Sequence, residues 1–166
     1  AAAVLLAVIG YSWFSGVFTP KTEEPGGNEA GQGNGAGASF ERSDYEAALE
    51  RARAWRVDAG LSRASVSTRG ETNFIFVSNT LRDKGFTVTV SGGIISAAGE
   101  VPFVSTGGEL PEDIISSEEA IMKTRQVPGY EDAKILSVEI IYGPDGGTWY
   151  WGIKTEKGTV TVKAAR

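Results

Sequence analysis

Two stretches decide the fold: residues 72–91, TNFIFVSNTLRDKGFTVTVS, and residues 149–163, WYWGIKTEKGTVTVK. Each joins an aromatic run to an alternation of Thr and Val, and the run Thr87–Val90 recurs as Thr159–Val162, 72 residues later. Alternating apolar and polar residues predict strands that bury one face. The recurrence therefore predicts β-structure of the same kind in both halves of the chain.

Further strands are expected around these two stretches. Leu81–Gly85 is predicted to be a hairpin loop, and Gly92–Gly93 a turn into a short run at Ile94–Ala97. The segment 102–111 has loop composition. The other predicted strands are Arg63–Thr68, which is weak, Lys134–Tyr142, Thr148–Thr155 and Thr159–Lys163.

One helix is predicted before each set of strands. Ser43–Glu46 has the spacing of a capping box, apolar residues then follow on one helical face as far as Ala59, and Gly60 is the expected stop. The second helix starts at one of the serines in Ser116–Ser117 and stops at Pro128–Gly129. The order helix, strand, strand, strand thus occurs twice, with the capping serines 73 residues apart.

We therefore expect an α+β fold made of two αβββ units, residues 40–101 and residues 102–166. In this arrangement antiparallel sheets are each covered by a helix. Each unit is small for an independent core, whereas the two together have the length of an ordinary domain.

Residues 1–18, AAAVLLAVIGYSWFSGVF, carry no charge. As a helix they would extend about 27 Å, close to the thickness of a bilayer core. An uncleaved transmembrane anchor is the favoured interpretation, and a cleaved signal peptide and a buried core helix are the alternatives. Residues 19–39 follow as a Gly-rich flexible linker. Its lack of excess positive charge favours an extracytoplasmic C-terminal part.

Composition excludes several function classes. The 166 residues contain no Cys and no His, so disulfides, thiolate zinc sites and a Ser-His-Asp triad are impossible. The net charge of −5 argues against a nucleic-acid partner. We expect no catalytic site, no cofactor and no metal. The acidic residues before the second helix fit its dipole, with divalent-ion binding as the alternative.

Two groups of residues are candidate partner-binding surfaces. Trp149 and Trp151 share one face of a strand and Tyr150 the other, so the tryptophans are either a core pair or an exposed platform for a peptide or glycan. The basic group around the first helix is either a solvated face or a patch for anionic lipid or wall polymer. Its members are Arg51, Arg53, Arg56 and Arg63.

The second half resembles the PepSY domain. The resemblance rests on Ser117–Ala120, Pro128–Gly129, Val138–Tyr142, Trp149 and the final strand Gly158–Val162. The first half, with YEAALERARAWRVDAGL, TNFIF and FTVTVSGGIISAAG, is similar to the PepSY-like units of YpeB-type spore germination proteins. One N-terminal membrane helix before PepSY-like repeats is also their plan.

The resemblance implies a membrane-tethered, single-pass, extracytoplasmic protein that binds and regulates a protein partner. The suspected partner is a secreted or cell-wall hydrolase or peptidase. Exposed sheet edges give a physical route, because they can accept an extended segment by strand addition. The alternative function is a structural subunit of a surface assembly or pilin-like filament, which self-associates through residues 1–18.

Overall fold

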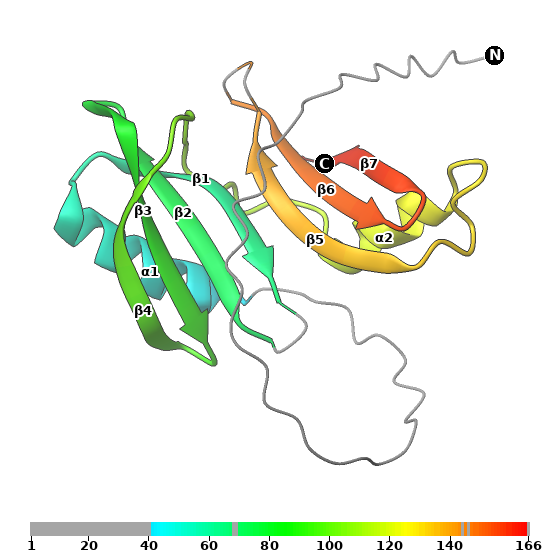
Figure 1. The fold of residues 1–166 in the computed structure, drawn as a ribbon, viewed down its shortest axis with the longest axis horizontal. Coiled ribbons are helices and arrows are strands. Elements are labelled where there is room, and N and C mark those ends of the chain that lie inside the picture. Colours follow the sequence, from blue (N-terminus) through cyan, green and yellow to red (C-terminus); the bar gives the residue numbers. More distant parts are fainter. Residues whose placement is uncertain (1–40, 68–69, 144, 146, 166) are drawn as a thin grey trace. The chain divides into compact units, whose positions relative to one another are not determined.

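A computed structural model of the chain describes residues 41–67, 70–143, 145 and 147–165, and all of these belong to one compact unit (Figure 1). The predicted transmembrane segment 1–18 and linker 19–39 lie outside the described residues. Neither helix in the described part is long and apolar enough to cross a membrane. The elements are α1 (Arg42–Trp55), β1 (Ala59–Val66), β2 (Thr72–Ser78), β3 (Leu81–Ser91), β4 (Ile94–Pro102), α2 (Ser117–Arg125), β5 (Ile135–Tyr142), β6 (Trp149–Thr155) and β7 (Gly158–Lys163).

All seven strands form one antiparallel sheet in the order β4-β3-β2-β1-β5-β6-β7. The α+β class is therefore confirmed, but the strands share one sheet rather than separate ones. β1 joins β5 through the pairing of Arg63–Val66 with Val138–Ile141. Both helices cover the same face of this sheet (Figure 1). Apolar residues of both central strands are buried in one cluster, which is why the two halves merge.

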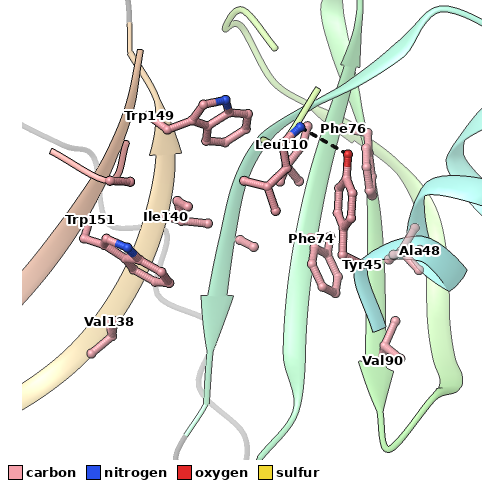
Figure 2. Packing of buried hydrophobic residues seen from close by; sticks show 14 of the residues in the cluster. Tyr45, Ala48, Phe74, Phe76, Val90, Leu110, Val138, Ile140, Trp149 and Trp151 are labelled. Atoms are coloured by element: carbon pink, nitrogen blue, oxygen red, sulfur yellow. Dashed lines mark hydrogen bonds between the residues drawn. The ribbon is translucent and has the colours of Figure 1, made fainter. Parts of the chain in front are cut away.

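A row of paired residues crosses the helix-covered face and shows how the aromatic strands build the core. Phe74 of β2 and Trp151 of β6 occupy matching places on either side of the β1–β5 pair. Figure 2 shows the two aromatic side chains within the buried cluster. The full row is Val88, Phe74, Ala64, Ile140, Trp151 and Val162.

The start of α1 differs from the predicted capping box. Glu41 is the N-cap and makes no side-chain capping bond, so Ser43 lies inside the first turn. The next residue, Asp44, is buried and accepts a 2.7 Å hydrogen bond from the backbone N–H of Gly93. Gly92 and Gly93 both have positive φ, so this tight turn needs glycine and presents its amide to α1.

The end of α1 also differs, because Ala59 and Gly60 begin β1 and do not continue the helix. Ala59 pairs with Ser78 of β2. The Ser78 hydroxyl donates a hydrogen bond to the carboxylate of Asp58, just before β1, and lies 2.8 and 2.9 Å from its two oxygens. This hydrogen bond lowers the pKa of the Asp58 carboxyl. The tertiary pairing thus overrides the helical periodicity.

The predicted loop Leu81–Gly85 is wrong, because these residues form the first part of β3. The turn is Asn79–Thr80, and Ser78 pairs directly with Leu81. The Ser78 and Thr80 hydroxyls lie 2.8 Å apart and close the turn. Charged residues in this part of β3 face solvent, which gives the strand the composition of a loop.

The segment between β4 and α2, which we call the crossing segment, passes from one face of the sheet to the other. Phe103 and Gly107 lie on the face that the helices leave uncovered, and Leu110 and Ile115 are buried in the core on the helix-covered face. Gly85 makes room for Phe103, and Gly107 passes so close to Gly60 and Val77 that a Cβ on Gly107 would lie 2.6 Å from atoms of both. Gly108 then bonds to Leu61 by two 2.9 Å backbone hydrogen bonds, one in each direction. The segment fills the place where β1 and β5 diverge.

α2 begins and ends as predicted. Ser116 is the N-cap, and its hydroxyl accepts a 3.2 Å hydrogen bond from the backbone N–H of Glu119. The last helical residue is Arg125, shortly before Pro128–Gly129. The capping-box spacing is therefore a correct signal here.

Candidate functional site

The structure places the predicted aromatic group mainly in the core. Trp149 and Trp151 are each 2 % exposed (Figure 2). Their indole N–H groups donate to the carbonyls of Glu109 at 3.2 Å and Ile115 at 3.0 Å. An exposed platform is therefore wrong for both tryptophans, because the helix-covered face of β6 buries them. These two hydrogen bonds hold the segment that leads to α2 against β6.

Tyr150 lies on the opposite face of β6 and is half-buried. Its hydroxyl is 3.4 Å from a carboxylate oxygen of Asp145. This contact lies within the turn between β5 and β6. Tyr150 is thus separated by the sheet from the two tryptophans beside it in the sequence.

The four predicted arginines do not form one patch. The Arg51 guanidinium lies 5.5 Å from the centre of the Phe86 ring, while Arg53 and Arg56 are exposed near the end of α1. Arg63 lies on β1, 5.3 Å from the Phe103 ring centre, on the face that the helices leave uncovered. The basic group is therefore divided between two faces of the molecule.

The acidic residues before α2 form no cation site in the described part of the chain. No group of three or more acidic residues close enough to hold a metal ion occurs there. Glu119 instead forms a 3.5 Å ion pair with Lys123, four residues later in α2. Such a pair supports the helix rather than a ligand.

The edge strand β4, which we call the β4 edge (Ile94–Pro102), is longer than the expected run Ile94–Ala97. Among the described residues, β4 has a strand neighbour on one side only, β3. Its side chains are exposed or half-buried throughout, and Ile94 is 73 % exposed. No residue from Ile94 to Gly99 is charged. The unpaired backbone groups of such an edge can pair with another strand.

A bulge divides the β4 edge into two parts. Val90 pairs with Ile95 and Thr89 with Ala97, so Ser96 is the extra residue. A bulge twists and interrupts an edge, which limits uncontrolled pairing. The regular part is therefore Ala97–Pro102.

The far end of the β4 edge is anchored to α1. A carboxylate oxygen of Glu100 accepts the indole N–H of Trp55 at 2.8 Å, and the other oxygen pairs with the ammonium of Lys84 at 3.0 Å. The Trp55 hydrogen bond, and then Lys84, hold the pKa of Glu100 below its ordinary value. Trp55 also stacks on Phe86 with ring centres 5.2 Å apart. These contacts fix the strand before any partner arrives.

A shallow hollow lies at this anchored end of the β4 edge. Its lining residues come from the facing ends of β3 and β4 and are Asp83, Lys84, Glu100, Val101 and Pro102. Both charge signs occur in the lining. A side chain of a segment bound along β4 could enter this hollow and make polar contacts.

Comparison with known proteins gives no guide to this site. No protein family, no curated protein and no solved structure matches the chain. What the chain does therefore has to follow from its own sequence and geometry.

Proposed function

We propose that this chain is a membrane-tethered, extracytoplasmic binding protein that takes up an extended segment of a protein partner along the β4 edge. The observation that carries the proposal is a nine-residue edge strand with exposed side chains, no charge from Ile94 to Gly99 and one strand neighbour in the described fold. The suspected partner is a secreted or cell-wall hydrolase or peptidase, whose activity the binding modulates.

The physical basis is strand addition. Main-chain hydrogen bonds to a sheet edge supply affinity, and contacts with alternate side chains supply specificity. The small side chains of Ser96, Ala97 and Ala98 leave the backbone accessible to another chain. The anchor at Glu100 lowers the entropic cost of binding, because β4 is already held in place.

The geometry supports two related units of the PepSY-like αβββ type. In chain order, α1, β1, β2 and β3 correspond to α2, β5, β6 and β7, with the antiparallel β1–β5 pair between them. The Thr-Val runs then fall on corresponding strands, β3 and β7. The aromatic strands β2 and β6 also correspond. β4 is the additional strand of the first unit.

The membrane tether in this proposal rests on residues 1–18, and the spacer on residues 19–39. Eighteen uncharged residues suit a single membrane crossing, and a Gly-rich spacer gives a binding domain a range of about 25 Å. The hydrolase or peptidase partner rests on the PepSY resemblance of the repeated units.

Site-specific crosslinking with the full chain tests this function. A photoreactive side chain at Ala97 on the β4 edge is compared with one at Ala54, which is exposed on α1. With purified secreted and cell-wall hydrolases and peptidases, we expect a crosslink from position 97 to an extended segment of one enzyme, together with a change in its activity. Position 54 should give neither.

Two results would contradict the proposed function. Equal crosslinking from positions 97 and 54 would mean that binding does not use the β4 edge. Crosslinks from position 97 only to further copies of the chain would instead favour the structural subunit of a surface assembly.

A further inference from the structure

We infer that the outer edge of β7 is a second strand-accepting site, which takes an extended, uncharged segment of a partner protein similar in chemistry to β4. The inference does not depend on whether the β4 edge binds a partner. It rests on a comparison of β7 with β3, the strand that β4 covers.

β7 and β3 share a local sequence, and each pairs on its inner side with an aromatic strand. Both carry Thr-Val-Thr-Val, at Thr87–Val90 in β3 and Thr159–Val162 in β7. β3 pairs with the aromatic strand β2, and β7 pairs with the aromatic strand β6. On the outer side, β3 has β4 as its partner, whereas β7 has no second strand neighbour among the described elements.

The burial of the valines also differs between the two strands. Val88 and Val90 of β3 are 0 % exposed, with β4 residues paired beside them. Val160 and Val162 of β7 are only half-buried, although they lie on the same helix-covered side of the sheet. Apolar surface that is covered in one half is thus partly exposed in the other. A strand beside β7 would remove this surface from water, which is favourable.

Neighbouring contacts define the ends of the β7 site. Ile114 forms a single antiparallel bridge with Ala165, beyond the end of β7. At the other end, the Tyr130 hydroxyl lies 3.5 Å from the carbonyl oxygen of Lys157. The stretch Thr159–Lys163 between these contacts is the length of edge open to a strand.

β4 shows which chemistry fits beside a Thr-Val strand. Ala98 pairs with Val88, Ala97 with Thr89 and Ile95 with Val90. Opposite the valines, an incoming segment therefore needs small or aliphatic side chains. Opposite the threonines it needs small ones. A charged side chain facing Val160 would be brought against apolar surface without a partner, which is costly.

Hydrogen exchange of the full chain with a synthetic peptide of the uncharged part of β4, residues 94–99 (IISAAG), tests the β7 site. We expect backbone amide exchange in Thr159–Lys163 to slow by about tenfold at saturating peptide. Exchange in the protein's own β4 should not change. A matched peptide with N-methyl groups on alternate residues lacks the backbone donors for pairing and should give no protection.

A protein variant gives an independent readout. Val160→Lys places a charge on the half-buried side of β7 and should weaken peptide binding by about tenfold. Ala54→Lys adds the same charge to the exposed surface of α1 and should leave binding unchanged. If Val160→Lys does not fold, the N-methylated peptide still decides the question.

Three outcomes would overturn the inference. Protection at β4 alone, or at neither edge, would show that β7 does not accept the strand. Equal protection by the N-methylated peptide would show that backbone pairing is not involved. Protection of β7 without peptide that grows with protein concentration would identify a second copy of the chain as the occupant.

Discussion

The two halves of the sheet have the same order of helix and three strands, but only the first half has a fourth strand. β4 covers β3, and its Glu100 reaches back to Trp55 near the end of α1. α1 has 14 residues, whereas α2 has 9 and ends without a counterpart of this contact in the described chain. In the first half, β4 thus covers the outer edge of β3. In the second half, the outer edge of the corresponding strand β7 has no strand beside it among the described elements.

The two halves also hold the crossing segment in different ways. In the first half, the Tyr45 hydroxyl accepts the backbone N–H of Leu110 at 3.3 Å (Figure 2), and burial raises the pKa of Tyr45. In the second half, Trp149 and Trp151 donate to backbone carbonyls of the same segment. The segment is therefore fixed from both sides, and the halves should unfold together.

The largest expected effect tests this shared core. Phe74→Ala and Trp151→Ala remove matching aromatic side chains from the two halves, and each should lower the free energy of unfolding by about 3–5 kcal/mol. Urea denaturation of either variant should show one transition by fluorescence and circular dichroism. Two separate transitions would mean that the halves are independent domains.

A smaller effect should distinguish β3 from β7. Val88→Ala removes a fully buried side chain and should cost about 2 kcal/mol, whereas Val160→Ala should cost less than about 1 kcal/mol because Val160 is half-exposed. Urea midpoints of the two variants give the comparison. Equal losses of unfolding free energy would contradict the difference in burial, since the Val160 side chain would then be as buried as that of Val88.

The regular parts of this fold follow from local sequence. The alternation in Phe86–Ser91 and Gly158–Val162 corresponds to strands, and the Ser116 capping signal corresponds to a helix start. These signals involve residues close in sequence. The Ser43 signal has the same spacing and fails, because the N-cap is Glu41, two residues earlier, and Ser43 lies inside the first turn.

The candidate site does not follow from local sequence, because it depends on which strand lies at the edge of the sheet. Ile94–Ala97 is recognisable as a short run, but Ala98, Gly99 and Glu100 have weak strand propensity. They are strand residues because β3 offers a pairing partner along their whole length. The merging of the halves through β1 and β5 likewise depends on tertiary contacts. The weak strand signal of Arg63–Thr68 does not reveal them.

The smallest expected effect concerns the Glu100 anchor, which only the first half has. The hydrogen bond from Trp55, and then Lys84, lower the pKa of Glu100 in the folded state. The ionised carboxylate therefore stabilises the folded chain at pH values above the unfolded-state pKa. This contribution to stability is lost as the pH falls through the folded-state pKa. The loss should begin below about pH 4.5. Glu100 is 45 % exposed, so solvent screens the interaction and the effect is modest.

The Glu100→Gln variant should therefore lose less stability than the unchanged chain when the pH is lowered from 7 to 3, as measured by urea midpoints. The control is Glu112→Gln, at an exposed position, which should behave like the unchanged chain. At pH 7, Glu100→Gln should also speed amide exchange in β4 and leave β7 unchanged, because the carboxylate joins β4 to α1 and has no contact with the second half. Faster exchange in both edge strands would show that the anchor acts on the whole sheet. The difference between the halves would then lie in their burial and not in their attachment to a helix.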